Sequence, residues 1–410
     1  RHIIVRADPA RRLLSIQVDQ EKEVTASLPD AFRTGGNARF VLGNVNLNKF
    51  SKRGFCGKIR NVKLVHPYRP DREIDFQAIG PSAKPLAHAG QEISYLCATA
   101  MPNRNFYFPG FAVLKDGSWA VVSREGEEHV CPYGRIVFSR SMDGGKNWSV
   151  PVCLVDGPGD ERDPALLQLP DGRLLLTWRD ALSWNEGDAA KRYASATAYL
   201  KQAGIRLNRQ FYQFSRDNGA TWDAPIEVPG FSPHGPAFYQ NAFYQPTIAV
   251  RDGKRYIDLL KGSADAGKWE KIATIAESPT ADPGTIQEPH LTVLKDGTMV
   301  CAIRVHSDGY MRISRSTDGG STWSTPEKTP VRGFPQHLTQ LADGRLLATY
   351  GYRYYPMGVR ACFSSDGGRT WDLPGEVIIR DRGVHGELGY PVSVQLADGQ
   401  IATACYYNSK

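Results

Sequence analysis

The sequence lacks the features that mark membrane proteins, metal proteins and nucleic-acid-binding proteins. No stretch of about 18 apolar residues occurs among its 410 residues, so no membrane-spanning helix is predicted. The seven cysteines are odd in number and show no Cys-x-x-Cys spacing, which favours neither a zinc site nor a disulfide framework. Lysine and arginine form no run of five or six, and the net charge is only +7, so we predict no nucleic-acid-binding face.

Turn-forming residues are abundant, and many of them belong to a repeat. With 40 glycines and 27 prolines, the chain is expected to contain many turns. Four segments share the pattern Ser-x-Asp-x-Gly-x-x-Trp, called an Asp box below, and a degenerate fifth copy spans residues 263–269. The four lie at residues 141–148, 215–222, 316–323 and 364–371. In such a box Asp accepts backbone N–H bonds, Gly supplies a positive φ and Trp fills the gap between packed sheets, so we interpret it as scaffold.

A second repeat places an Asp-Gly pair between two apolar runs. Asp-Gly between alternating strands is a strong hairpin signal. The aspartates of the six copies are Asp116, Asp171, Asp252, Asp296, Asp343 and Asp398. A proline lies six or seven residues before the aspartate in five copies, and in the remaining one Gln336 takes that place beside Pro335. Six all-β units of this kind predict a six-bladed β-propeller over residues 84–410.

The two ends of the chain depart from the repeat. Only twelve residues follow Asp398, so we expect a strand at residues 92–99 to complete the last blade, with a truncated C-terminus as the alternative. Residues 1–83 contain strand-like runs but no Asp box. Within them, residues 40–43 and 55–62 resemble the later strands of a laminin-G or concanavalin-like jelly roll. This resemblance implies a partial jelly-roll segment that serves carbohydrate contact or packing.

The propeller repeat also predicts which side chains surround the central funnel. The residues before the prolines should lie nearest the axis: Phe108, Asp163, Gln245, Glu288, Pro335 and Tyr390. Arg124, Arg179 and Arg304 share one register, because each lies eight residues after the aspartate of an Asp-Gly pair. Arg162 and Arg353 are two further candidate binding residues. Arginine suits bidentate capture of a carboxylate or phosphate. The alternative is that each arginine pairs with a neighbouring acid such as Asp163 or Asp180.

Together the Asp boxes, the six units and this ring resemble the sialidases over most of the predicted propeller. The resemblance implies a tyrosine nucleophile whose base is a glutamate. Glu288 opens an E-x-x-x-x-x-L-x-D-G strand and is followed by Arg304, as the family's base is followed by a carboxylate-binding arginine. Tyr390 stands at the start of the last unit, where the family has its nucleophile. Arg353 or Arg360 would supply a further arginine of the family's triad.

The sequence departs from the family pattern in the first blade. The family has an Arg-Ile-Pro motif there, whereas this chain has Phe108 before the proline and no arginine. The aspartate that serves as the family's general acid is not obvious either. Glu128 or His129, in the loop after the second strand, could donate the proton, and Asp163 in the next blade is another candidate.

The resemblance implies an exo-glycosidase of the sialidase superfamily that hydrolyses a terminal acidic sugar, sialic acid or a related one, from a glycan. The resemblance implies a retaining mechanism through Tyr390, since a carboxylate beside the anomeric carbon would repel an anionic carboxylate nucleophile. No cofactor or metal is expected. A start at Arg1 favours a processed or truncated chain, and we expect a secreted or periplasmic protein. The alternatives are a non-catalytic carbohydrate-binding propeller and a polysaccharide lyase with Tyr or His as base against a uronic acid.

Overall fold

The computed structural model describes residues 105–407 and five short strands between residues 3 and 73. The chain divides into two compact units, Arg1–Leu86 and Ala87–Lys410. The strands of the first unit are β1 (Ile3–Asp8), β2 (Leu13–Val18), β3 (Val24–Ser27), β4 (Val65–His66) and β5 (Arg69–Glu73). Strands β1 to β3 form one antiparallel sheet, and β4 pairs with β5. Residues 40–43 and 55–62, on which the jelly-roll prediction rests, lie outside the described residues.

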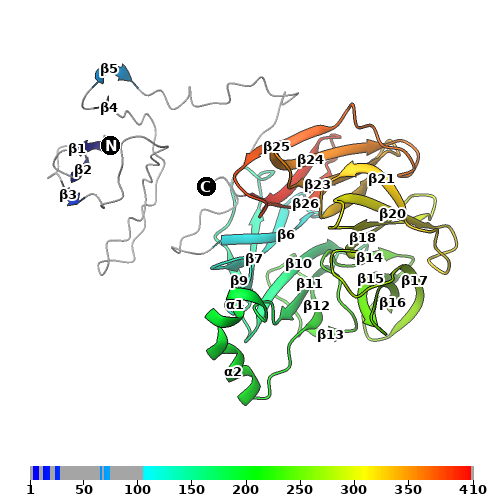
Figure 1. The fold of residues 1–410 in the computed structure, drawn as a ribbon. Helices are drawn as coiled ribbons and strands as arrows, with labels where there is room; N and C mark the ends of the chain where they lie inside the picture. Colours follow the sequence, from blue (N-terminus) through cyan, green and yellow to red (C-terminus); the bar gives the residue numbers. More distant parts are fainter. Residues whose placement is uncertain are drawn as a thin grey trace. The chain divides into compact units, whose positions relative to one another are not determined.

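Five four-stranded antiparallel sheets and one two-stranded sheet follow one another along the second unit. Figure 1 shows them arranged around a common centre. The four-stranded sheets, here called blades 1 to 5, contain β6 to β9, β10 to β13, β14 to β17, β18 to β21 and β22 to β25. The two-stranded sheet contains β26 and β27. The second unit is therefore mainly β and a β-propeller, as the repeat predicts.

The strand bounds follow the Asp-Gly hairpins closely. Blade 1 comprises β6 (Asn105–Val113), β7 (Trp119–Gly126), β8 (Arg135–Ser141) and β9 (Val152–Val155). Blade 2 comprises β10 (Asp160–Gln168), β11 (Leu174–Ala181), β12 (Arg209–Ser215) and β13 (Ile226–Val228). Blade 3 comprises β14 (Ala237–Tyr239), β15 (Ala242–Arg251), β16 (Lys254–Ser263) and β17 (Trp269–Ser278). Blade 4 comprises β18 (Gln287–Val293), β19 (Met299–Arg304), β20 (Tyr310–Ser316) and β21 (Glu327–Arg332). Blade 5 comprises β22 (Gln336–Gln340), β23 (Leu346–Tyr352), β24 (Met357–Ser364) and β25 (Val377–Gly383), and the small sheet comprises β26 (Gly389–Gln395) and β27 (Ile401–Tyr406).

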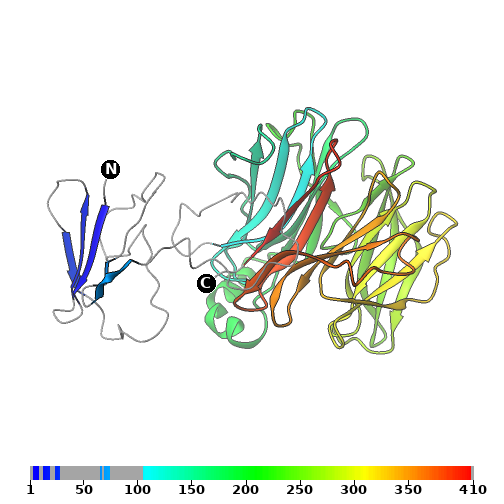
Figure 2. The same ribbon diagram turned by 90° about the horizontal axis from the view of Figure 1, so that it is seen from above.

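The small sheet closes the ring between the last blade and the first. Strand β26 contacts β22 and β23 of blade 5, and both β26 and β27 contact β6 of blade 1. Figure 2 shows the two red strands of this sheet beside the cyan strands of blade 1. The strand that we expect at residues 92–99 lies outside the described residues.

Two short helices interrupt blade 2, and the sequence repeat did not predict them. They are α1 (Gly187–Arg192) and α2 (Ala194–Gln202), inserted between β11 and β12. The insertion has its own small core, in which Trp184 and Leu200 pack with Cys131 of the β7–β8 loop. In the described part of the chain, neither these nor any other helix has the length and apolar character to cross a membrane.

The Asp boxes have the local geometry that their residue types predict. In the box at residues 215–222, Asp217 Oδ1 accepts from the Thr221 backbone N–H at 2.8 Å and from the Ser215 hydroxyl at 2.9 Å. Gly219 has a φ of 89°, and its backbone N–H donates to Ser215 Oγ at 2.8 Å. The degenerate box at residues 263–269 makes an equivalent contact between Ser263 Oγ and Asp265, 2.5 Å apart. The boxes are therefore self-contained turns that present a tryptophan.

Each of four box tryptophans packs into the core between its own blade and the one before it. Trp222 packs with blades 1 and 2, and Trp269 with blades 2 and 3. Trp323 packs with blades 3 and 4, and Trp371 with blades 4 and 5. The predicted role of Trp as a filler between sheets is therefore confirmed at these four positions.

A buried carboxyl group lies where blade 1 meets blade 2. Glu161 on β10 is 1% exposed, and its Oε2 has no hydrogen-bond partner among the described residues. Burial raises the pKa of Glu161 to about 8, although backbone N–H groups of Gly157 and Gly159 act in the opposite direction. The folded protein therefore holds a proton on this carboxyl at a pH where the unfolded chain has lost it.

Replacing Trp371 by alanine should lower the free energy of unfolding by about 3–5 kcal/mol, because this ring is almost fully buried. Trp323→Ala is the matched control: it changes the same position of the preceding box, but its ring is only partly buried, so the loss should be smaller. Urea unfolding of both variants measures the difference. No loss in Trp371→Ala would contradict the packing role of the boxes.

Glu161→Gln should remove part of the pH dependence of stability. Because the folded-state pKa of Glu161 is raised, its contribution is fully present below the unfolded pKa of about 4.3 and is lost as the pH rises through about 8. The variant should therefore match the wild type near pH 4 and exceed its melting temperature above pH 8. If the melting temperatures of the two proteins instead change with pH in the same way across this range, the pKa of Glu161 is not raised in the folded protein.

Candidate active site

Four of the residues that precede the prolines share one strained backbone conformation. Phe108, Asp163, Glu288 and Tyr390 have φ angles of 52°, 53°, 44° and 45°. At each of them the pairing with the next strand shifts register, which marks a β-bulge. Proline suits this place because it has no N–H to lose from the ladder. A bulge re-aims the side chain, and here it brings residues of different blades into contact.

Tyr390, Glu288 and Arg304 form the centre of the candidate site. The Tyr390 hydroxyl donates to Glu288 Oε1 at 2.7 Å. The other carboxylate oxygen accepts from Arg304 Nη1, so Glu288 lies between the two side chains. The Arg304 guanidinium stacks over the Phe334 ring at 4.3 Å, and its Nε is buried without a hydrogen-bond partner. Three candidates from blade 4 and the small sheet are thus in direct contact, while their catalytic roles remain predictions.

The surroundings of the pair fix where its proton lies. Burial and the nearby Glu288 charge raise the pKa of Tyr390 well above its usual value. Burial also acts to raise the pKa of Glu288, but the Arg304 charge and the bond from Tyr390 outweigh it and lower this pKa to about 2. The tyrosine is therefore protonated and donates to a carboxylate. The contact provides the path by which that proton can move to Glu288.

Blade 2 adds two arginines that share one carboxylate. Arg162 Nε lies 3.4 Å from Asp163 Oδ2, and Arg179 Nε lies 3.9 Å from the same oxygen. The Arg162 guanidinium also stacks over the Phe108 ring at 4.8 Å. Arg162 thus brings a cation next to the position where blade 1 has Phe108 instead of the arginine of the sialidase pattern. Burial raises the pKa of Asp163 despite both arginines.

Arg353 and His129 are two further predicted residues that lie beside Tyr390 and Phe108. Arg353 Nε donates to the Leu388 carbonyl at 3.1 Å, and its guanidinium lies 6.0 Å from the centre of the Tyr390 ring. His129 packs edge-on against Phe108, with 5.2 Å between ring centres. Burial, followed by repulsion from Arg162 and other arginines, lowers the pKa of His129 to about 3. His129 is therefore a neutral imidazole at neutral pH.

Three other predicted residues are engaged elsewhere. Arg124 is fully buried, where its Nε bonds Asp160 Oδ1 at 2.6 Å and its Nη1 bonds the Glu128 carbonyl at 2.8 Å. The exposed Glu128 side chain forms an ion pair with Arg192 of α1. Arg360 bonds Glu376 at 2.6 Å within blade 5. Arg124 and Arg360, predicted to bind the substrate, are thus paired with acidic side chains of the protein, and Glu128, predicted as a proton donor, is paired with an arginine.

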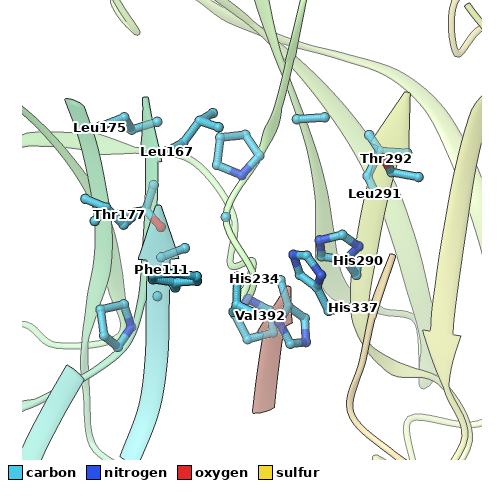
Figure 3. A pocket seen from close by; sticks show the side chains of 18 of the residues that line it. Phe111, Leu167, Leu175, Thr177, His234, His290, Leu291, Thr292, His337 and Val392 are labelled. Carbon is cyan, nitrogen blue, oxygen red and sulfur yellow. The ribbon is translucent and has the colours of Figure 1, made fainter. Parts of the chain in front are cut away.

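A cavity of about 310 Å³ lies beside the site and contains three histidines that sequence reasoning missed. Figure 3 shows His234, His290 and His337 gathered at one end, with Thr177 and Leu175 on the opposite wall. Tyr390 and Phe108 also line this cavity. His290 and His337 each follow an x-Pro position by one or two residues, so their shared register was a usable signal, whereas His234 lies in an irregular loop. Among the described residues no group of three or more His, Cys, Asp or Glu is arranged to hold a metal ion.

Two comparisons of sequence relate the chain to known proteins. A BNR repeat-like domain matches residues 118–403. A sialidase of Clostridium perfringens is 23% identical over 273 residues, which are 64% of this chain and 59% of that protein. The chain thus spans less than two thirds of the length of this relative.

Solved structures show the same fold at low identity. A protein of unknown function from Dyadobacter fermentans superposes with a TM-score of 0.57 at 24% identity, covering 75% of this chain and 91% of its own. A mutant of NanB sialidase from Streptococcus pneumoniae superposes with a TM-score of 0.57 at 13% identity, covering 82% and 70%. The Asp boxes, the ring of blades and the match over more than half of the chain agree, and this protein belongs to the BNR repeat-like domain family, whose propeller is related to that of the sialidases.

Proposed function

We propose that this protein is a sialidase-like exo-glycosidase that hydrolyses a terminal acidic sugar from a glycan. The observation that carries the proposal is the bond of 2.7 Å from the Tyr390 hydroxyl to Glu288, because nucleophile and base must be within such reach. The distant Clostridium perfringens sialidase supports a glycosidase, without fixing the sugar. A six-bladed ring completed by residues 92–99 and a secreted or periplasmic location belong to the same proposal.

The arginines would bind the carboxylate of the sugar. Arg304 is mostly buried, and its Nε has no hydrogen-bond partner. The Arg162 guanidinium lies over the Phe108 ring, and that of Arg353 lies over the Tyr390 ring. A guanidinium fork matches a carboxylate in geometry and charge. When a ligand carboxylate bonds Arg304, it competes with Glu288 for that cation. The basicity of Glu288 then rises at the moment when a substrate is present.

The chemical steps follow from these positions. Glu288 takes the Tyr390 proton as the tyrosine oxygen bonds the anomeric carbon, and the bond from that carbon to the glycosidic oxygen breaks. The leaving oxygen needs a proton, and Asp163 is the candidate acid because burial raises its pKa, whereas His129 is held neutral. Water then attacks the anomeric carbon and gives a proton to the Asp163 carboxylate, the bond from that carbon to the Tyr390 oxygen breaks, and Glu288 returns its proton to Tyr390. Two displacements retain the configuration of the sugar.

Tyr390→Phe should lower kcat by orders of magnitude, because the hydroxyl that would form the covalent bond is lost while ring packing stays. Glu288→Gln should have a similar effect by leaving the tyrosine proton without an acceptor. Tyr406→Phe is the matched control: its ring lies 5.9 Å from that of Tyr390, but its hydroxyl contacts Arg353 rather than Glu288.

Release of free sugar from an aryl sialoside and from a panel of acidic glycosides measures these effects. Equal rates for Tyr390→Phe and the wild type would rule out the proposed nucleophile. An unsaturated product that absorbs in the ultraviolet would favour the lyase, and glycan binding with no product would favour the carbohydrate-binding propeller.

Arg304→Ala should raise KM for carboxylated sugars by about tenfold or more while leaving any neutral ligand unaffected. Arg360→Ala is the control, because it removes an arginine of the same propeller that is already paired with Glu376. Initial rates on carboxylated and neutral aryl glycosides separate the two variants. Equal losses on both substrates would show that Arg304 does not bind the carboxylate.

A further inference from the structure

Two side chains of blade 2 lie side by side on the face that looks toward blade 3. Arg179 on β11 is directly opposite Gln210 on β12, so their side chains are neighbours on one face of the sheet. Leu175 and Tyr212, which alternate with them on the same face, pack with Phe243 of blade 3. The Arg179 guanidinium lies over the Phe231 ring at 4.0 Å.

Three polar atoms of this pair have no hydrogen-bond partner among the described residues. Arg179 Nε and both side-chain polar atoms of Gln210 are buried without a hydrogen bond, and Gln210 is 1% exposed. The nearest carboxylate to Arg179 is Asp163 at 3.9 Å, beyond hydrogen-bonding distance, and it lies closer to Arg162. Burial lowers the pKa of Arg179, as expected for a guanidinium with a poor counter-ion.

The next residues along the same strands show that the scaffold is able to pair such groups. Asp180 and Arg209 are also directly opposite each other, on the other face. Asp180 accepts from the Arg209 backbone N–H at 2.7 Å and from its Nε at 2.8 Å. Buried polar groups in native proteins are nearly always paired, and exceptions gather where a ligand supplies the partner. The unpaired atoms of Arg179 and Gln210 therefore indicate a ligand group.

The charge of the whole site indicates what kind of group. Four arginines surround it: Arg162, Arg179, Arg304 and Arg353. Two acidic side chains, Asp163 and Glu288, oppose them, so four minus two leaves two positive charges when both are ionised, and three remain while Asp163 carries the proton of the proposed general acid. Asp160 also approaches Arg162, at 3.3 Å, but it is balanced by the buried Arg124. A sugar with one carboxylate would neutralise one of these remaining charges.

We propose that Arg179 and Gln210 bind a second oxyanion of the substrate, a sulfate ester or a further carboxylate, in addition to the carboxylate held by Arg304. Arg179 supplies the charge and an Nε–H donor, and the Gln210 amide supplies another donor. The natural glycan would then be doubly acidic. This inference rests on the proposed binding of an acidic glycan in the funnel.

Gln210→Glu tests the proposal because it places a carboxylate beside Arg179 without changing the shape of the side chain. The internal ion pair should raise the melting temperature by about 2 °C or more and lower the affinity for inorganic sulfate about tenfold or more. Gln213→Glu, on the same strand but on the opposite face, should do neither. Calorimetric titration with sulfate and with acetate distinguishes a sulfate site from a carboxylate site. Unchanged binding of both anions in Gln210→Glu would overturn the proposal.

Two further variants keep the test decisive. If Gln210→Glu does not fold, Arg179→Gln should show the same loss of anion binding, and its retention there would equally overturn the proposal. Tyr390→Phe should bind sulfate like the wild type, because the hydroxyl lies outside the Arg179–Gln210 pair. A protein that binds sulfate through Gln210 but hydrolyses no glycoside would contradict the proposed function alone. Hydrolysis together with Gln210-independent sulfate binding would contradict this inference alone.

Discussion

The β-bulge before the proline is the constraint on which the candidate site depends. It forces a non-glycine residue into the left-handed region at Phe108, Asp163, Glu288 and Tyr390. Such a conformation costs roughly 1–3 kcal/mol per residue. The cost is offset by the packed blades on either side, which leave the strand no alternative register. Because the same distortion recurs around the ring, side chains from separate blades meet at one place, as Tyr390 and Glu288 do.

Arginines that lie together in one funnel repel one another unless acidic side chains neutralise them. In this structure the arginines differ in how completely they are paired with such acids. Arg124 is fully buried and bonds Asp160, the Glu128 carbonyl and Cys131, so it is part of the scaffold. Arg304 is paired with Glu288 but keeps an unpartnered Nε, and Arg179 has only a distant carboxylate. Arginines whose charge is closely paired thus differ from arginines that keep an unpaired polar atom, and the proposed ligand contacts fall on the second group.

The repeats predicted the propeller and the ring positions, since turn chemistry and periodicity are local properties of the chain. Register alone could not separate Arg124 from Arg304, because each occupies the same position of its blade and only the neighbouring acid differs. Glu128 was predicted as a candidate proton donor without knowledge of its partner, because the inserted helix α1, which supplies Arg192 to it, lies outside the repeat. His234 had no signal at all, since it reaches Tyr390 from an irregular loop. Long-range pairing decides such cases.

The order in which the tryptophans pack bears on how the chain folds as it is synthesised. Because Trp222, Trp269, Trp323 and Trp371 each reach back to the preceding blade, the apolar face of a blade stays uncovered until the next blade has emerged. The packing partners of each blade therefore become available in order from the N-terminal blade onward. The contact of β6 with β26 and β27 joins the two ends of the propeller sequence, so it is the last ring contact for which both sides are available as the chain emerges.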